Sequence, residues 1–296
     1  MLDFKTYIIL KLVSSIFFLL SGIIWKKLLF TERRNYHFIY FRVIATLFFL
    51  VSISALFQLF GNNTFSQIVL NTVGFKDWII CISICLFSFW GLYFYTNAMQ
   101  SGRYSFVTPL VVISSAFSFL TSLIVYNEAL SNSKYIALTL IITGLFLHQK
   151  EKLAQFKISK EVVLVLLCSI FWGISFVFYL IPIKKFGVLN FSIILETCVL
   201  ISCIGLLFFK EKRFFPTKMD KKSLLLCLLM GLMVAGGSLL SNFTLTQLPV
   251  SLNILIGLIF EIFVLAIGLF MFREKLNLKD WMLIGFASVG SFLLLF

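Results

Sequence analysis

The sequence predicts an all-α polytopic membrane protein whose ten transmembrane helices form two inverted repeats of five helices each. Three observations support this fold class: an apolar composition, ten apolar runs of transmembrane length, and an internal repeat. Of the 296 residues, 60% are hydrophobic and only 12% are charged, and the mean hydropathy is +1.05. A water-soluble domain carries about twice that share of charged residues. A membrane-spanning β-barrel would show short alternating segments in place of long apolar runs.

The predicted helices follow from apolar runs of about 20 residues, each long enough to cross a hydrocarbon core about 30 Å thick. The connections between these runs are short and hydrophilic, so the sequence predicts no soluble domain. Pro109 falls inside the fourth run, where it can kink a helix, and Pro182 falls at the end of the sixth. In chain order, we place the ten helices at residues 6–25, 37–58, 78–99, 104–126, 133–149, 162–182, 189–209, 223–246, 250–272 and 278–296.

The two halves of the chain repeat one another. A shift of 154 residues aligns residues 10–21, LKLVSSIFFLLS, with residues 164–175, LVLLCSIFWGIS. A shift of 146 residues aligns residues 126–147 with residues 272–293, because the first half has a longer connection after its second helix. We therefore divide the chain into two repeats of five helices, at residues 1–150 and 158–296.

Five helices per repeat place the second repeat upside down relative to the first, and the basic residues test this orientation. The connections after the odd-numbered helices hold 18 Lys and Arg residues, whereas the opposite side, including both termini, holds five. Because positive charge stays on the cytoplasmic side, we expect both termini outside, in the inner membrane of a bacterium. Inverted repeats are typical of secondary transporters, which bind substrate near the midplane between the repeats. The duplication also removes the need to dimerise, which suits a monomer.

Two motifs stand out in the predicted helices: the segment FWGISF at residues 171–176, and a phrase that follows both the fourth and the ninth helix. With these motifs and its five-plus-five helices, the sequence resembles a known family, the drug/metabolite transporter superfamily in its EamA-type branch with ten spans. The resemblance covers essentially the whole chain, and it implies a basket of ten helices in which helices 1–4 and 6–9 line a central cavity. It also implies export or exchange of small metabolites, such as amino acids or nucleotide-linked compounds. The paired phrase consists of Glu128, Leu130, Tyr135 and Gly144 in the first repeat and Glu274, Leu276, Trp281 and Gly290 in the second.

The chain departs from the family pattern in two places. In the first repeat, FFLLSG at residues 17–22 lacks the Trp-Gly pair that Trp172 and Gly173 form in the second. The single-repeat relatives carry a proton-coupling Glu in their first helix, and the matching positions here are Lys11 and Val165. That coupling mechanism therefore does not carry over to this chain.

Four charged residues lie well inside the predicted helices, namely Lys11, Arg42, Glu196 and Glu261. A charge at the bilayer centre costs at least about 2.5–3.5 kcal/mol on insertion scales, so each should face the protein interior or a partner. We expect Lys11 to snorkel to the interface, and Arg42 either to snorkel or to face a cavity. Glu196 occupies the position equivalent to Arg42 under the shift of 154, and it either makes a structural ion pair or lines the cavity.

Glu261 lies nearest the midplane of the ninth predicted helix, where a short acid cannot snorkel. Two interpretations remain open for it. It either forms a buried pair with Arg42 or Lys11, or it is a cavity carboxylate that senses substrate or couples protons. The first repeat has Ser115 at the position equivalent to Glu261 under the shift of 146.

Amide and aromatic side chains supply further candidates for substrate binding. An amide inside a membrane needs a hydrogen-bonding partner, whereas small residues and aromatic residues more commonly pack helices together. These candidates are Asn97, Asn242, Asn253, Trp90, Tyr93, Trp172 and Ser115.

The pattern favours a transporter over an enzyme. No G-x-S-x-G, H-E-x-x-H or phosphate-cradling motif occurs, and the six cysteines form no metal-ligand or disulfide pattern, so we predict no catalytic residue, metal or cofactor. The net charge of +13 follows from topology, so we expect no nucleic-acid partner. We predict a secondary transporter of a small organic metabolite that works by alternating access. The alternatives are a membrane-embedded enzyme, accessory or sensor protein for a lipid-linked compound, and a passive facilitator.

Overall fold

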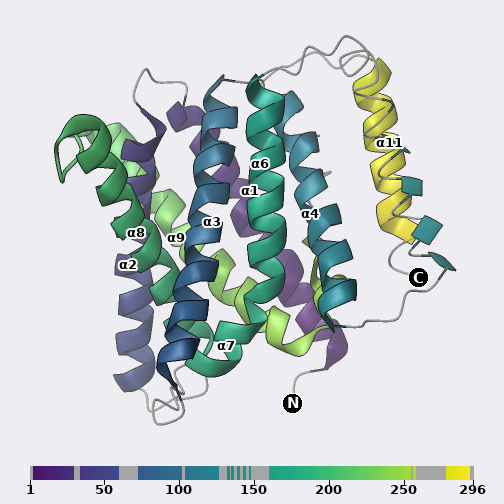
Figure 1. Ribbon diagram of the computed structural model, residues 1–296, viewed down its shortest axis with the longest axis horizontal. Helices are drawn as coiled ribbons and strands as arrows, with labels where there is room; N and C mark the ends of the chain where they lie inside the picture. The colour runs from purple at the N-terminus through teal and green to yellow at the C-terminus, as the bar shows by residue number, and fades with distance from the viewer. Residues whose placement is uncertain are drawn as a thin grey trace. The chain divides into compact units, whose positions relative to one another are not determined.

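A computed structural model of the chain is helical, and no strand occurs in the parts that it describes (Figure 1). The structure describes residues 3–29, 34–59, 73–101, 104–126, 160–254, 256–257 and 278–293, together with isolated positions between 132 and 147. The helices are α1 (Phe4–Leu29), α2 (Asn35–Leu59), α3 (Phe75–Ser101), α4 (Tyr104–Tyr126), α6 (Lys160–Phe178), α7 (Leu180–Phe186), α8 (Val188–Glu211), α9 (Lys221–Gln247) and α11 (Leu278–Leu293).

Membrane-spanning helices are confirmed in part. Among the described helices, α1, α2, α3, α8 and α9 are long and apolar enough to cross a membrane, and α6 with α7 gives a sixth if the bent pair is one span. The predicted fourth helix has the bounds of α4, which runs unbroken through Pro109. The predicted runs at 133–149 and 250–272 lie largely outside the described residues. The count of ten spans therefore stays a prediction.

The bend between α6 and α7 has a local cause in the sequence. The two helices meet at Tyr179, where the chain turns by 41°. Proline clashes with the carbonyl four residues before it and cannot donate to it. For Pro182 that carbonyl belongs to Phe178, which is the last residue of α6. The sixth predicted helix is thus broken one turn before its proline.

Chain contacts divide the molecule into two compact units, and each unit contains parts of both halves of the sequence. The first unit joins Met1–Tyr93 with Phe178–Leu248, and the second joins Phe94–Val177 with Pro249–Phe296. These units follow packing, whereas the repeats at 1–150 and 158–296 follow sequence similarity. The repeat boundaries therefore remain a prediction.

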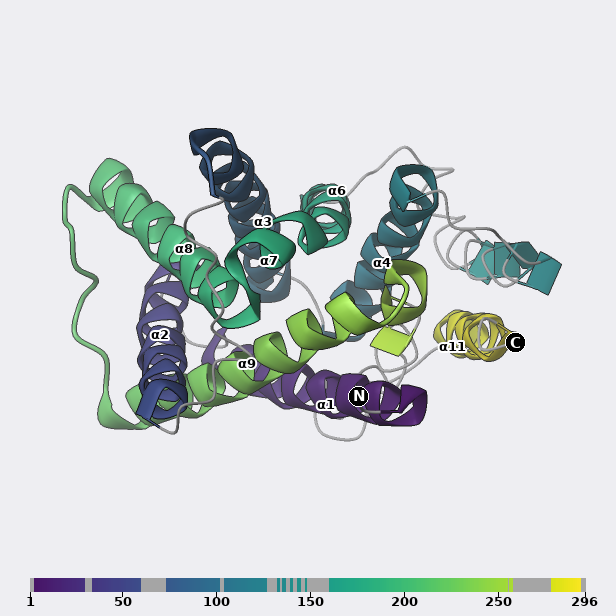
Figure 2. The ribbon, with the colours of Figure 1, turned by 90° about the horizontal axis from the view of Figure 1, so that it is seen from below.

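In the first unit, α9 packs along α1 and α2, and α2 packs against α8 (Figure 2). Gly231 of α9 allows the close approach to α2, because a Cβ atom there would lie 2.5 Å from Ala45 Cβ and 2.8 Å from the Thr46 backbone nitrogen. Such distances are shorter than any van der Waals contact. A small residue at this position is therefore required, as is common where membrane helices touch.

In the second unit, the FWGISF segment brings α6 against α4. A Cβ atom on Gly173 would lie 2.9 Å from Phe117 Cβ, and the Ser118 hydroxyl donates a hydrogen bond to the Gly173 carbonyl at 3.1 Å. One turn further on, the Tyr126 hydroxyl donates to the Val177 carbonyl at 2.9 Å. The glycine of this segment thus has a packing role in the second repeat, where the first repeat has a leucine.

Candidate functional site

A buried ion pair joins α2 to α8. Arg42 Nη1 donates a hydrogen bond to Glu196 Oε1 at 2.8 Å, and the two side chains are only 6% and 7% exposed. Arg42 therefore does not snorkel, and Glu196 makes an ion pair; a role in binding substrate stays a prediction for both. The partners are 154 residues apart, which is the shift that relates the two halves of the chain.

The ion pair leaves two of its own polar atoms unused. Among the residues that the structure describes, Arg42 Nε and Glu196 Oε2 are buried and have no hydrogen-bonding partner. A buried polar atom without a partner costs about 1–3 kcal/mol, and more in a charged group. The pair thus leaves one donor and one acceptor unsatisfied, and a ligand that pairs with both must supply an acceptor and a donor.

A second polar contact, between α9 and α8, lies one helical turn from Glu196. Asn242 Nδ2 donates to Ser192 Oγ at 2.9 Å, and the Ser192 hydroxyl donates to the Val188 carbonyl at 2.8 Å. Ser192 and Glu196 are four residues apart, so they lie on one face of α8. Asn242 therefore has the partner that an amide needs inside a membrane.

A third polar contact joins α9 to α1 through the residue that precedes Asn242. Lys11 Nζ donates to Ser241 Oγ at 2.9 Å, and the Ser14 hydroxyl donates to the Gly237 carbonyl at 2.8 Å. Lys11 is buried, at 5% exposure, so the expectation that it snorkels to the interface is wrong. Its ammonium group points to a neighbouring helix because α9 covers that face of α1.

These contacts define the buried polar layer of the first unit. The sequence identified its charged and amide members, but it missed the serines that partner them. Serine is common in apolar helices. In the sequence, Ser192 is marked only by its spacing of four residues from Glu196, and Ser241 only by its position next to Asn242. The layer consists of Lys11, Ser14, Arg42, Ser192, Glu196, Ser241 and Asn242.

The remaining sequence candidates are not among these seven residues. Trp90 is 38% exposed and stacks edge-on against Tyr93, with ring centroids 5.7 Å apart. In the second unit, Trp172 packs against the ring of Tyr95 at 5.1 Å. Asn97 is half-buried and Asn253 is fully buried. Glu261 and the side chain of Ser115 lie outside the described residues, so their roles stay predictions.

In the part of the chain that the structure describes, no group of three or more His, Cys, Asp or Glu residues could hold a metal ion.

Comparisons with known proteins show what the chain is similar to. Residues 159–296, slightly less than half of the chain, match the EamA-like transporter family. No curated protein matches the sequence. A solved crystal structure has the same fold, with a TM-score of 0.68 and 12% sequence identity over 98% of this chain and 96% of the other. The match over residues 159–296 confirms the resemblance drawn from the sequence: this part of the chain is similar to the EamA-like transporter family, and the long apolar helices are those of an integral, multi-pass membrane protein.

Proposed function

We propose that the chain is a secondary transporter of a small organic metabolite, such as an amino acid, and that it works by alternating access between two inverted repeats. The similarity of residues 159–296 to the EamA-like transporter family supports the first part. Helix lengths support the second, because α3 and α9 both have 27 residues and begin 146 residues apart, the shift found in the sequence.

The observation that carries the proposal is the contact between Arg42 and Glu196. Two residues related by a two-fold axis can touch only where the axis passes between them. Because these residues are equivalent under the shift of 154, their ion pair supports an axis between α2 and α8. Transporters built from inverted repeats bind substrate at this place, near the midplane between the repeats.

The chemistry of the pair supports a substrate with both an acidic and a basic group. A carboxylate accepts from the free Arg42 Nε, and an ammonium group donates to the free Glu196 Oε2. A substrate that binds both atoms competes with the ion pair and weakens the link between α2 and α8. Binding and the movement of the repeats are coupled in this way, because the substrate interacts differently with the two states.

Counterflow in proteoliposomes tests the proposal. Vesicles loaded with one member of a metabolite panel should take up the same labelled compound from outside, with and without a pH gradient. Arg42→Lys keeps the charge but removes the planar group, and it should lower the rate more than Gly205→Ala, a change on the same pair of helices that meets no other atom within 4 Å. Absence of uptake for every compound would count against a transporter.

The same assay examines the predicted role of Glu261 in proton coupling. Glu261→Gln should remove any dependence of uptake on the pH gradient, because an amide does not titrate. Normal transport by this variant at every pH value would rule out the coupling role. Flux that only runs down the substrate's own gradient would indicate a passive facilitator.

A further inference from the structure

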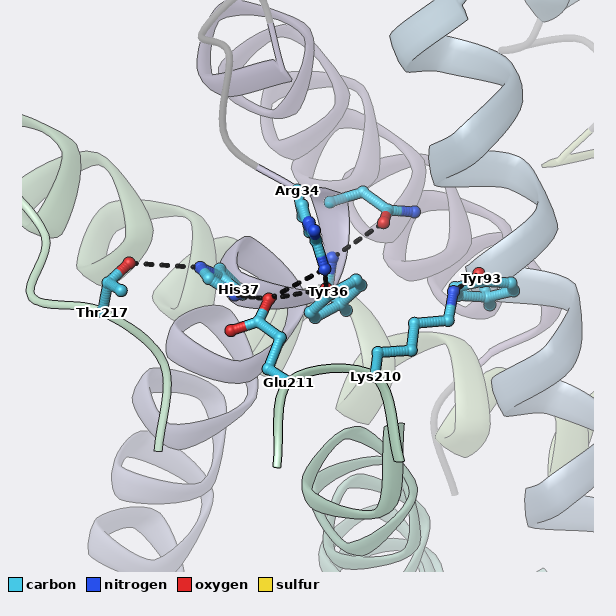
Figure 3. A network of polar contacts seen from close by, with 8 residues as sticks. Arg34, Tyr36, His37, Tyr93, Lys210, Glu211 and Thr217 are labelled. Carbon is cyan, nitrogen blue, oxygen red and sulfur yellow. Dashed lines mark hydrogen bonds and ion pairs between the residues drawn. The ribbon is translucent and has the colours of Figure 1, made fainter. Parts of the chain in front are cut away.

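A second polar network lies at one end of the first unit, where α2 begins and α8 ends (Figure 3). Its centre is Glu211, the last residue of α8. Glu211 Oε1 accepts a hydrogen bond from the Tyr36 hydroxyl at 2.6 Å and lies 2.9 Å from His37 Nε2 and 3.4 Å from Arg34 Nη1. Three side chains from within four residues, Arg34 just before α2 and Tyr36 and His37 in its first turn, thus converge on one carboxylate oxygen.

The network extends on both sides of Glu211. Arg34 Nη1 also donates to the Tyr36 hydroxyl at 2.7 Å, and the Thr217 hydroxyl lies 3.4 Å from His37 Nδ1. A His37 ring that donates from Nε2 to Glu211 can therefore accept from Thr217 at Nδ1. Glu211, at the end of α8, and Thr217, in the segment after it, thus contact the two ring nitrogens of the same histidine.

Lys210, the neighbour of Glu211, ties α8 to a third helix. Its ammonium group donates to the Tyr93 hydroxyl of α3 at 2.7 Å and lies 5.5 Å from the ring centroid of Tyr36. Cation–π contacts of this geometry are attractive. Two adjacent residues at the end of α8 therefore hold α2 and α3.

The burial of Glu211 and its position at the negative end of the α8 dipole indicate that its role is to bind the side chains of α2. The side chain of Glu211 is 14% exposed and that of His37 is 7% exposed, so the contact between them is better shielded from water than a surface ion pair, whereas Arg34 is 60% exposed and its contact with Glu211 is a surface ion pair. A carboxylate at a helix C-terminus is also repelled by the helix dipole. The hydrogen-bond donors near the start of α2 offset that repulsion. Within α8 alone, a glutamate at this position does not stabilise the helix.

The equivalent positions of the other repeat lack the residues of this network. Under the shift of 154, the positions equivalent to Tyr36, His37 and Glu211 are Asn190, Phe191 and Phe57, which include no carboxylate. Two inverted repeats that rock about an axis would open their two ends alternately. An attraction present at one end alone makes the state with that end closed more stable than its mirror state.

We infer that the Glu211 network is an electrostatic lock, which holds the start of α2 to the end of α8 and must break each time that end of the transporter opens. This inference rests on the proposed transport function. The lock lies on the side predicted to be cytoplasmic, to which Arg34 and Lys210 belong. It sets the resting state of the protein, closed on that side.

Pulsed electron paramagnetic resonance tests the lock in the full-length protein. Spin labels on ketone-bearing unnatural amino acids at Ile44 of α2 and Phe209 of α8, both exposed, report the separation of the two helices and leave the cysteines unchanged. Tyr36→Phe removes one donor and Glu211→Ala removes the acceptor. Tyr40→Phe is the matched control, one turn along α2, because its hydroxyl has no hydrogen-bonding partner among the described residues.

Tyr36→Phe should raise the ratio of long to short distances about tenfold, the effect of one lost hydrogen bond to a charged group, and Glu211→Ala, which removes the acceptor of all three contacts, should raise it at least as much. Tyr40→Phe should leave the ratio within about twofold of the unmodified protein. If Glu211→Ala does not fold, Tyr36→Phe decides the question. An unchanged ratio in folded Tyr36→Phe would overturn the lock.

Counterflow on the same samples separates the two proposals. Uptake by the unmodified protein combined with an unchanged distance ratio would refute the lock and leave the transporter intact. A shifted ratio in a protein that shows no uptake for any compound would refute the transport function, and with it the role of the network in a transport cycle.

Discussion

Neutralising one partner of the Arg42–Glu196 pair is the most informative change to stability. Glu196→Gln keeps the shape of the side chain and leaves the guanidinium group of Arg42, 6% exposed, without a counter-charge. Breaking a buried pair in this way costs about 3–5 kcal/mol, because the remaining charge is desolvated and unpaired. In a chain of this length, that loss lowers the melting temperature by roughly 5–10 °C.

The double variant Arg42→Met with Glu196→Leu tests whether the lost stability comes from an unpaired buried charge. It removes both charges, and replacement of a buried ion pair by apolar residues of similar size is commonly neutral or stabilising by about 1–4 kcal/mol. We expect it to recover most of the melting temperature lost in Glu196→Gln. Unfolding is followed by tryptophan fluorescence at one heating rate and in one detergent, because membrane proteins commonly unfold irreversibly. A loss below about 1 °C in Glu196→Gln, or no recovery in the double variant, would refute the reasoning.

Three further predictions concern the packing and polar contacts of the first unit. Gly231→Ala should cost about 1–3 kcal/mol in the same melting assay, because the new methyl group overlaps α2, whereas Gly205→Ala, with no atom within 4 Å, should not destabilise. Equal melting temperatures for the two would contradict the close helix contact. Asn242→Leu should lose about 0.5–1.5 kcal/mol with its hydrogen bond to α8, and an unchanged stability would contradict that bond. A water-soluble acylating reagent should modify exposed Lys5 and spare buried Lys11, as measured by peptide mass spectrometry; equal rates would show that Lys11 reaches the interface.

Hydropathy predicted the helices well because the cost of burying polar backbone in lipid dominates their placement. The predicted helix at 37–58 lies within α2 (Asn35–Leu59), and the one at 223–246 lies within α9 (Lys221–Gln247). The predicted helix at 6–25 is shorter than α1, which continues to Leu29 through Lys26 and Lys27. Charged residues end an apolar run in the sequence, but they extend a helix beyond the hydrocarbon core.

Side-chain partners were less predictable, because they depend on which face of each helix meets its neighbour. The shift of 154 made Arg42 and Glu196 equivalent, yet it did not show that they touch. Lys11 lies near a helix end, which favoured snorkelling, and only the packing of α9 against α1 explains its bond to Ser241. Burial follows from helix packing, and hydropathy alone contains no information on it.

The Glu211 network was also missed, for a related reason. Tyr36 and His37 begin one helix and Glu211 ends another, and the sequence separates them by more than half the chain. A glutamate among lysines after an apolar run has the ordinary composition of a membrane interface. In the sequence, Glu211 is marked only by the difference from Phe57, the residue at the equivalent position of the other repeat.

Counterflow by the charge-free double variant tests the central claim most directly, because Arg42→Met with Glu196→Leu should fold as stably as the natural pair while it removes the proposed substrate contacts. The account predicts saturable uptake by the unmodified protein and a loss of at least about tenfold in the double variant, since each lost charge-assisted hydrogen bond weakens binding by about that factor. Equal uptake by the two proteins would contradict it.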